Sequence, residues 1–355
     1  MGKSYTGKRQ RTHVKRIEKQ NEEMPPPETP TSTPSWGTSI IAQVKADRYL
    51  QALFVLTLIG AFLRFYHLDY NSLWLDEAAT LNFARQSPAE IWQIAAGGEF
   101  NPPLFYWIEH LMLIFGDSEF VLRFVPALFG VLTIPLTYSL GKELADKSTG
   151  LIAAILLTFS PMHIFYSQDA RAYTISVFFV ILAALFYIKA MELEDYRLWM
   201  LFGIAAAVSF WLHFYTILAI AAILMHALLV SAKQIQERIR YLAVSLATIL
   251  LLTLPIILVA IPLFAKRTAS SPTFGYQGWL VIQQTFSQFS GFNNAIAVAF
   301  MLLFILGLTF WFSSDKKKAA FILIFICVPL AMSILMSYRM PFIPRHLLYL
   351  LPLFL

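Results

Sequence analysis

The sequence predicts an all-α fold: a polytopic transmembrane helical bundle with a long first extracytoplasmic loop. Hydrophobic residues make up 58% of the 355 residues and charged residues only 14%, whereas a soluble domain carries roughly 45–50% apolar and about 25% charged residues. The mean hydropathy is +0.62, and long apolar runs recur from residue 48 onward. The bilayer is therefore the natural solvent for most of this chain.

Charge and cysteine content exclude several classes of protein. The formal net charge is +6, but the basic residues lie in the N-terminal segment and in turns between apolar runs. This is the positive-inside pattern of membrane proteins, and it does not suggest a nucleic-acid partner. Because Cys327 is the single cysteine, neither an intrachain disulfide nor a thiolate metal site is expected.

Residues 1–46 are predicted to be a disordered, basic and Pro-rich cytoplasmic tail. Lysines and arginines crowd residues 1–23, and a Pro/Thr/Ser stretch follows at 24–36. Such a composition buries no core, although its basic part can contact anionic membrane lipids. The segment is polar and the first apolar run is long enough to span, so we expect no cleavable signal peptide. Residues 47–355 are then one transmembrane domain.

Nine apolar runs have about the 20 residues that a spanning helix needs. They cover residues 48–67, 119–140, 148–166, 171–191, 196–212, 214–232, 241–264, 295–312 and 318–337. A partial tenth run begins near residue 345 and reaches Leu355 without a closing polar flank. We therefore expect about nine complete spans, a partial tenth, and a domain that is truncated at its C-terminal side.

The run 102–116 is short for a span and carries Glu109 and His110, which favours an interfacial position. If it does not span, four basic turns lie on the same side as the basic tail, as the positive-inside rule asks. These turns are 141–147, 193–197, 233–240 and 314–318. The N-terminus is then cytoplasmic, and the loop 68–118 is extracytoplasmic.

The loop 68–118 is predicted to hold short helices that lie along the membrane surface. Ser87-Pro88-Ala89-Glu90 is a capping box with proline at the first helical position. The helix that it starts is expected to end at Gly97-Gly98, and Asn101-Pro102 indicates another helix start. The aromatic residues of the loop are expected to anchor it at the interface.

Asp76 and Glu77 are adjacent within the motif LWLDEAAT of this loop. Neighbouring side chains on a helix point roughly 100° apart, so the two carboxylates cannot face one atom equally. One interpretation is that one carboxylate acts chemically while a partner holds the other. The alternative is helix capping, with Asp76 as N-cap and Glu77 in the first turn, and the two interpretations do not exclude each other.

A second cluster, SQDARAY at 167–173, joins two predicted spans at their outer ends. Asp169 and Arg171 either pair and cap the next helix, or Arg171 offers its forked hydrogen bonds to a phosphate. Further ionisable residues close predicted spans at the same face, where snorkelling or a structural hydrogen bond is the alternative role. They are Arg64, His67, Arg123, His213, Tyr338, Arg339, Arg345 and His346.

Several site types are absent from the sequence. It contains no Gly-rich nucleotide loop, no Cys/His zinc spacing and no dense mid-span charge pairs. Coupled transporters tend to place such pairs near the bilayer midplane, whereas here the charges gather at span ends on one face. This favours an enzyme that acts on a lipid-linked substrate, with a transporter or lipid flippase as the alternative.

Four segments in order carry a family resemblance. LWLDEAAT follows the first span, and NPPLFYW, EFVLRFVPALFGVLTIPLTYSLGKEL and GLIAAILLTFSPMHIFYSQDARAYT come after it. Together they resemble the GT-C membrane glycosyltransferases, in the protein-O-mannosyltransferase and aminoarabinose-transferase-like branch that includes the RgtA/B/C/D-like enzymes. The resemblance covers roughly residues 48–232, and more loosely the rest. Family members usually carry ten or more spans, which also suggests a C-terminally short chain.

The resemblance implies an activity and its partners. A sugar would pass from a polyprenyl- or dolichyl-phosphate donor to a hydroxyl of a protein, lipid or glycan acceptor. The reaction would take place at the extracytoplasmic face of the plasma membrane. It needs no nucleic acid, and we predict no cofactor.

The resemblance also places a catalytic acidic residue at the Asp76–Glu77 pair. We expect Asp76 to be the general base, with Glu77 as its catalytic neighbour. Arg171 is the first candidate for binding the donor phosphate, followed by Arg339 and Arg345.

The remaining expected site residues are supporting ones. Asp169 is expected to orient Arg171, with His213 and Tyr173 beside them. No metal is predicted, although Asp76, Asp169 and His213, together with Glu77, carry oxygen and nitrogen atoms of the kind that bind a divalent cation.

Overall fold

The computed structural model describes residues 47–355, apart from 194, 231–234 and 270. The basic, Pro-rich tail predicted for residues 1–46 lies outside the described residues. The chain divides into Met1–Arg48 and Tyr49–Leu355, and the architecture below is that of the second unit.

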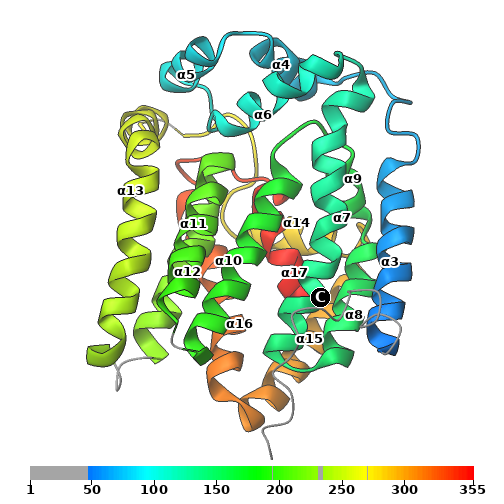
Figure 1. Ribbon diagram of the computed structural model, residues 1–355, viewed down its shortest axis with the longest axis vertical. Coiled ribbons are helices and arrows are strands. Elements are labelled where there is room, and N and C mark those ends of the chain that lie inside the picture. The colour runs from blue at the N-terminus through cyan, green and yellow to red at the C-terminus, as the bar shows by residue number, and fades with distance from the viewer. Residues whose placement is uncertain (1–46, 194, 231–234, 270) are drawn as a thin grey trace, which may run out of the picture. The chain divides into compact units, whose positions relative to one another are not determined.

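Helices of 12 to 33 residues, together with the seven-residue α9, run side by side between two ends of a bundle (Figure 1). They are α3 (Arg48–Phe65), α7 (Glu119–Leu144), α8 (Lys147–Thr158), α9 (Pro161–Ser167), α10 (Tyr173–Leu193), α11 (Tyr196–Leu212), α12 (Ile217–Val230), α13 (Ile235–Arg267), α15 (Asn294–Ser314) and α16 (Lys316–Met336). Shorter elements are α14 (Trp279–Phe289), η2 (Phe214–Thr216), η3 (Pro344–Leu350) and α17 (Leu351–Phe354).

Among the described residues, six helices are long and apolar enough to cross a membrane, and the bent pair α8–α9 is a seventh candidate. The chain is thus a multi-pass membrane protein. The expected count of nine spans is not confirmed, because α11 and α12 have 17 and 14 residues, fewer than the about 20 that a span needs. The expected partial tenth span forms η3 and the one-turn helix α17.

The predicted span 148–166 is broken into α8 and α9, which meet at 63°. Pro161 lacks a backbone N–H and its ring clashes with the carbonyl four residues earlier, so α8 cannot continue through it. The Ser160 hydroxyl instead accepts a 3.4 Å hydrogen bond from the His163 amide and caps α9.

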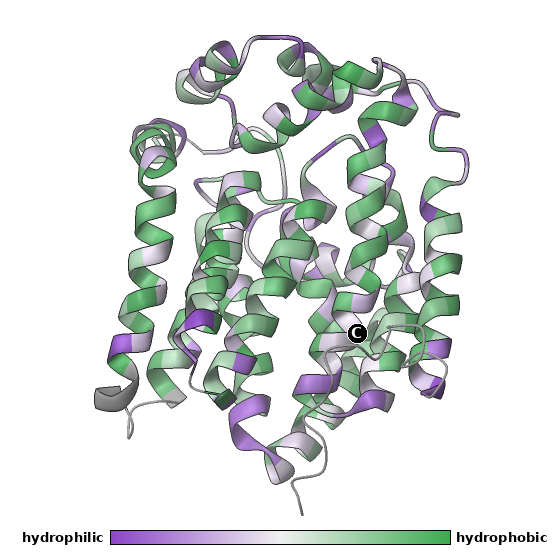
Figure 2. Ribbon diagram, in the orientation of Figure 1, coloured by the Kyte–Doolittle hydropathy of each residue, from purple (hydrophilic) through white to green (hydrophobic). Residues whose placement is uncertain are grey.

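Burial within the bundle differs sharply from helix to helix. α10 packs against α7 and α11 and is the most buried candidate span, whereas α3 and α15 are mostly exposed. Exposed apolar side chains, such as Leu251 at 76% and Phe310 at 77%, are those expected to face lipid. Hydrophobic residues fill the middle of the bundle and hydrophilic ones gather at its two ends (Figure 2).

Three short helices form a layer across one end of the bundle (Figure 1). They are α4 (Leu75–Ala84), α5 (Pro88–Gly97) and α6 (Leu104–Met112), and we call them the cap layer. The predicted capping box is present, because Ser87 and Glu90 exchange their side-chain hydrogen bonds. The short run 102–116 forms α6 and the 3₁₀ turn η1 (Leu113–Phe115) within this layer.

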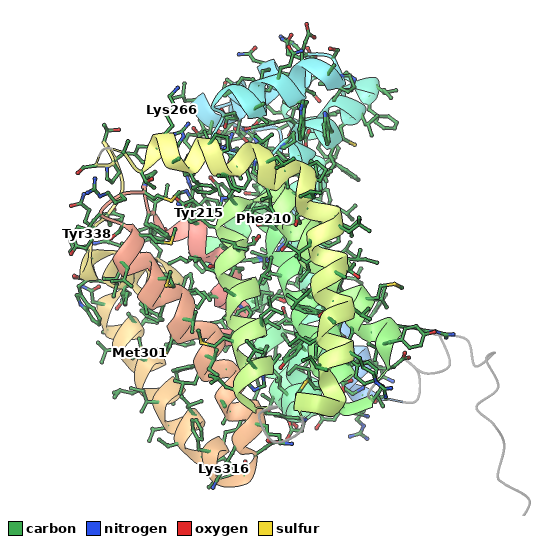
Figure 3. All side chains as sticks on the ribbon, turned by 90° about the vertical axis from the view of Figure 1, so that its left-hand side faces the viewer. Phe210, Tyr215, Lys266, Met301, Lys316 and Tyr338 are labelled. Carbon is green, nitrogen blue, oxygen red and sulfur yellow. The ribbon has the colours of Figure 1, made fainter. Side chains whose placement is uncertain are left out.

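The C-terminal part of α13 turns sideways beneath the cap layer and ends near Lys266 (Figure 3). Pro255 and Pro262 lie inside this helix, and internal prolines are the usual cause of a sharp bend. Lys316, the first residue of α16, lies at the opposite end of the bundle.

Glu109 in α6 is fully buried, and neither carboxyl oxygen has a hydrogen-bond partner among the described residues. Burial raises the pKa of Glu109 well above its ordinary value, because the charged form loses its hydration. The folded chain therefore holds this proton more tightly than the unfolded chain. The resulting stability is fully present below the unfolded pKa of about 4.3, and it is lost as the pH rises toward the folded pKa.

We expect Glu109→Gln to be more stable than the native chain at about pH 8 but not at about pH 4, because an amide cannot ionise. Thermal unfolding of the purified chain at both pH values measures this difference. Glu90→Gln is the matched comparison, since Ser87 lowers the pKa of Glu90 and the loss of its charge is expected to destabilise at the higher pH. A Glu109→Gln variant with the native pH dependence would contradict the assignment.

Candidate active site

The Asp76–Glu77 pair lies in the first turn of α4, which begins at Leu75. The helix thus starts earlier than the capping alternative requires, and Trp74 is the N-cap residue rather than Asp76. The two carboxylates point into different surroundings, as adjacent helical residues must. Glu77 is buried and Asp76 is partly exposed.

Glu77 is held by four hydrogen bonds. Arg123 donates from Nε to Oε1 at 2.7 Å and from Nη2 to Oε2 at 2.6 Å. The Ala170 amide donates to Oε1 at 2.9 Å and the Trp74 amide to Oε2 at 3.2 Å. A carboxylate so fully engaged has little capacity left to accept a proton from a substrate, and Glu77 instead ties α4 to α7 and to the 168–172 turn.

Arg123 also organises the chain between α3 and α4. Its Nη1 donates to the carbonyls of Leu68 at 2.9 Å and Asn71 at 2.8 Å, and its Nη2 to Ser72 at 3.3 Å. A planar guanidinium with five donors suits this task, and the pair with Glu77 supplies the countercharge that a buried cation needs.

Asp76 faces Arg345, which comes from η3 and is distant in sequence. Arg345 Nη2 donates to Asp76 Oδ2 at 3.0 Å, and both side chains keep about a quarter of their surface exposed. The guanidinium lies 5.4 Å from the ring centre of Trp74 and 5.5 Å from that of Tyr173, within cation–π range. Its Nε is buried without a partner in the described part of the chain.

Asp169 lies beside this pair and is also buried. Trp74 Nε1 donates to its Oδ1 at 3.0 Å, whereas Oδ2 has no partner among residues that the structure describes. Burial raises the pKa of Asp169 to about 7, against the lowering effect of the Trp74 hydrogen bond and of the charges on Arg171 and Arg345. This carboxyl group therefore changes charge near neutral pH.

Arg171 is buried, and its Nη1 donates to the Asp76 carbonyl and to the Thr80 hydroxyl, each at 3.3 Å. Its side chain makes no salt bridge with Asp169 in the described structure. The two residues are linked through the backbone, where the Arg171 amide donates to the Asp169 carbonyl at 2.6 Å. A cavity of about 10 Å³ adjoins the guanidinium. It is lined by Asn101, Phe105, Tyr106, Ala172, Tyr173 and His213.

His213 and His346 form an aromatic group with Tyr215, behind the charged residues. His346 stacks on Tyr215 with ring centres 4.3 Å apart, and His213 lies 5.5 Å from both His346 and Tyr173. Burial lowers the pKa of His213 to about 3 and that of His346 well below its ordinary value. Both imidazoles are therefore neutral at pH 7.

Arg339 stands apart from the other expected phosphate-binding residues. It is exposed in the turn after α16, and its side chain has no hydrogen-bond or ion-pair partner in the part of the chain described. Asp76, Glu77, Asp169, Arg171, Tyr173, His213 and Arg345 are the predicted residues that the fold brings together.

Some residues of this cluster were not predicted. Trp74 was expected only as an interfacial anchor, yet it contacts both Asp169 and Arg345. Thr80 follows Asp76 by four residues, which places both on one helix face and was a usable signal. Tyr166 neighbours Arg345 and directly precedes the SQDAR turn.

The cluster does not form a metal centre in the described structure, where no group of three or more His, Cys, Asp or Glu side chains is placed to hold an ion. Arginines engage Asp76 and Glu77 instead.

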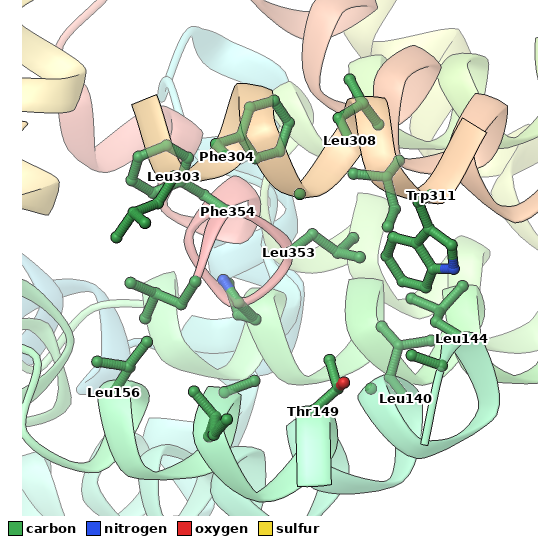
Figure 4. Close-up of a pocket in the computed structure, with 18 of the residues that line it drawn as sticks. Leu140, Leu144, Thr149, Leu156, Leu303, Phe304, Leu308, Trp311, Leu353 and Phe354 are labelled. Carbon is green, nitrogen blue, oxygen red and sulfur yellow. The ribbon is translucent and has the colours of Figure 1, made fainter. Parts of the chain in front are cut away.

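A cavity of about 510 Å³ lies elsewhere, among α7, α8, α15 and α17 (Figure 4). Leucines, Phe304, Phe354 and Trp311 dominate its lining, so its surface is mainly apolar.

The sequence is similar to a known protein family and to a curated protein. Residues 101–259 match the family model of dolichyl-phosphate-mannose-protein mannosyltransferase. This segment contains Arg123, Asp169, Arg171 and His213. An uncharacterised protein of Aquifex aeolicus (strain VF5) is 32% identical over 157 residues, which are 41% of this chain and 32% of that protein.

Solved structures share the fold. ArnT from Cupriavidus metallidurans, bound to undecaprenyl phosphate, superposes with a TM-score of 0.63 at 14% identity, covering 89% of this chain and 59% of ArnT. The apo oligosaccharyltransferase of Archaeoglobus fulgidus gives a TM-score of 0.56 at 14% identity, covering 86% of this chain and 49% of that one. The resemblance to the GT-C glycosyltransferases is confirmed. The chain spans about a third to three fifths of the length of these relatives.

Proposed function

We propose that this protein transfers a sugar from a polyprenyl- or dolichyl-phosphate donor to a hydroxyl acceptor at the extracytoplasmic membrane face. The observation that carries the proposal is the partly exposed Asp76 in α4 of the cap layer, paired with Arg345 and with Arg171 adjoining, at one end of the bundle. A carboxylate next to two cations, at the end of a set of membrane helices, suits a hydroxyl nucleophile and a lipid phosphate leaving group. The ArnT relative bound to undecaprenyl phosphate supports this donor class.

In the proposed reaction, Asp76 accepts the proton of the acceptor hydroxyl while its oxygen forms a bond to the anomeric carbon of the sugar. The bond between that carbon and the phosphate oxygen breaks, and the lipid phosphate leaves as an anion. The leaving group needs no acid, because positive charge stabilises it. Arg345 and Arg171 supply this charge, and the exposed Arg339 is not required.

The Asp76–Arg345 ion pair bears on the order in which the donor binds and the base becomes free. Arg345 binds Asp76 at 3.0 Å before substrate arrives, and its buried Nε has no hydrogen-bond partner among the described residues. We propose that the donor phosphate draws Arg345 away from Asp76 and so releases the base. Glu77 then acts as a positioning residue and not as a second catalytic group, because Arg123 and two backbone amides occupy it.

The proposed orientation puts the cap layer outside the cell membrane and the basic turn near Lys316 in the cytoplasm. The positive-inside rule supports this assignment. Sugar identity and the acceptor, whether protein, lipid or glycan, are questions for the assay.

The function is tested by transfer of radiolabelled sugar from a panel of polyprenyl-phosphate donors in membranes that contain or lack the chain. We expect label to appear in a hydroxyl-bearing acceptor only when the chain is present. Movement of undecaprenyl phosphate across the vesicle membrane, without any transfer of labelled sugar, would instead support the transporter or flippase alternative.

Arg345→Met is expected to weaken binding of undecaprenyl phosphate about 10- to 100-fold, since a hydrogen bond to a charged group contributes roughly 1.5–3 kcal/mol. Titration of the purified chain with undecaprenyl phosphate measures the change. Arg339→Met removes a similar side chain close by in sequence and is expected to bind as the native chain does. Equal weakening in both variants would contradict a specific role for Arg345.

A further inference from the structure

Arg64 is a fully buried guanidinium in the last turn of α3. No carboxylate forms an ion pair with it among the described residues. Its Nη1 donates to the carbonyls of Gly60 at 3.2 Å and Thr158 at 3.4 Å. Its Nη2 donates to the Leu157 carbonyl at 3.1 Å and to His163 Nδ1 at 2.9 Å. An ionisable group in a membrane helix is costly, so a function is the default hypothesis.

The partners of Arg64 lie at the break between α8 and α9. The last carbonyls of a helix have no partner within it, and a membrane interior offers little water to satisfy them. Arg64 satisfies the Leu157 and Thr158 carbonyls at the end of α8. Its positive charge also meets the negative end of the α8 dipole, so the 63° bend is stabilised where lipid alone would not support it.

Two glycines make room for this side chain. A methyl group added at Gly130 would lie 3.2 Å from Arg64 Cδ and 2.2 Å from Ser167 Oγ, and one added at Gly60 would lie 3.3 Å from Arg64 Nη1 and 2.2 Å from Ile134 Cδ1. Glycine at these two positions thus leaves room for Arg64 and for its neighbours Ser167 and Ile134.

A residue at the end of α9 in turn binds the end of α3. Gln168 Nε2 donates to the carbonyls of Leu63 and Arg64, each at 3.3 Å, and of Tyr66 at 3.0 Å. These carbonyls belong to the end of α3 and the residue after it. Arg64 therefore caps α8 while Gln168 caps α3.

We propose that Arg64 and Gln168 form a reciprocal helix-end lock that keeps the two halves of the active site in register. The end of α3 leads through the Arg123-bound loop to Asp76, and the end of α9 leads directly to Asp169 and Arg171. Besides the lock, these two segments are joined by the Ala170–Glu77 and Trp74–Asp169 hydrogen bonds and by those from Arg171 to α4. Arg64 and Gln168 are positioning residues, and this inference rests on the proposed function only for its activity readout.

The test uses the full chain with spin labels on cysteines at exposed Tyr70 and Phe165, in a Cys327→Ser background. One label follows α3 and the other lies on α9. The distance distribution between them is measured in the native sequence, Arg64→Met, Arg64→Lys, Gln168→Leu and the Arg64→Met/Gln168→Leu double variant. Arg197→Met, an exposed arginine at the far end of α10–α11, is the matched control.

We expect the distance distribution to shift or broaden in each single variant, less in Arg64→Lys, and no further in the double variant, because either substitution opens the same lock. The control keeps the native distribution. In the transfer assay, kcat is expected to fall about 100-fold, the loss expected from a displacement of about 1 Å, with a smaller change in KM.

A native distance distribution in folded Arg64→Met and Gln168→Leu, or additive effects in the double variant, would overturn the lock. If Arg64→Met does not fold, Arg64→Lys and Gln168→Leu decide the question in the same way. The label distances need no turnover, so a chain that transfers no sugar would remove the proposed function while the lock is still judged by distance.

Discussion

Asp76→Asn is expected to reduce sugar transfer about 10²–10⁴-fold, which is the usual contribution of a general base. The asparagine side chain keeps the size of Asp76 but cannot accept a proton from the acceptor hydroxyl. The loss is expected in kcat. Binding of undecaprenyl phosphate should stay equal or become tighter, because Arg345 loses the carboxylate that it contacts in the resting state. Initial rates at varied donor concentration, with a parallel titration of undecaprenyl phosphate, separate the two quantities.

Asp69→Asn is the matched control, since Asp69 is an exposed acid in the same interhelical loop. It is expected to keep native rates. Full activity in Asp76→Asn would remove Asp76 from the mechanism and leave Asp169 as the candidate base, since its buried Oδ2 has no partner among the residues that the structure describes.

Glu77→Gln is expected to lower the free energy of unfolding by roughly 3–5 kcal/mol, the typical cost of leaving a buried charge without its partner. Arg123 would retain its cation at a site where only 6% of its side chain is exposed. Equilibrium unfolding of the purified chain measures the loss. Limited proteolysis should also cut the 66–74 segment faster, because Arg123 holds that loop only while it is itself held in place.

Asp117→Asn provides the comparison, because it breaks the Arg85–Asp117 ion pair, whose side chains are 52% and 63% exposed. An exposed pair contributes only about 0–1 kcal/mol. Similar losses in the two variants would show that burial does not set the value of the Glu77–Arg123 pair.

Local sequence signals predicted individual elements well where the cause is local. The Ser87–Glu90 capping box starts α5 as expected, because capping depends on residues three apart. Apolar run length identified the helices of the bundle. It did not reveal the break before Pro161, since a run count ignores that proline removes a donor, and it did not resolve the spans at α11 and α12.

The sequence predicted which residues belong to the candidate site better than it predicted which of them contact one another. Adjacent residues on a helix must face different surroundings, so one of Asp76 and Glu77 was expected to be held by a partner. Which one, and by what, depends on contacts across 46 residues to Arg123 and 269 residues to Arg345. The expected pairing of Asp169 with Arg171 is absent from the described structure, where backbone and hydroxyl groups bind Arg171 instead.

The sequence by itself determined that this chain folds as membrane helices with its ionisable residues at the helix ends, because hydropathy and charge alone decide what a bilayer accepts. Only the tertiary structure decided which of those residues meet. Helix packing brings Arg123 to Glu77, Arg345 to Asp76 and Arg64 to the end of α8. Each contact joins residues that are far apart in the chain, and nothing in linear spacing specifies which residues meet.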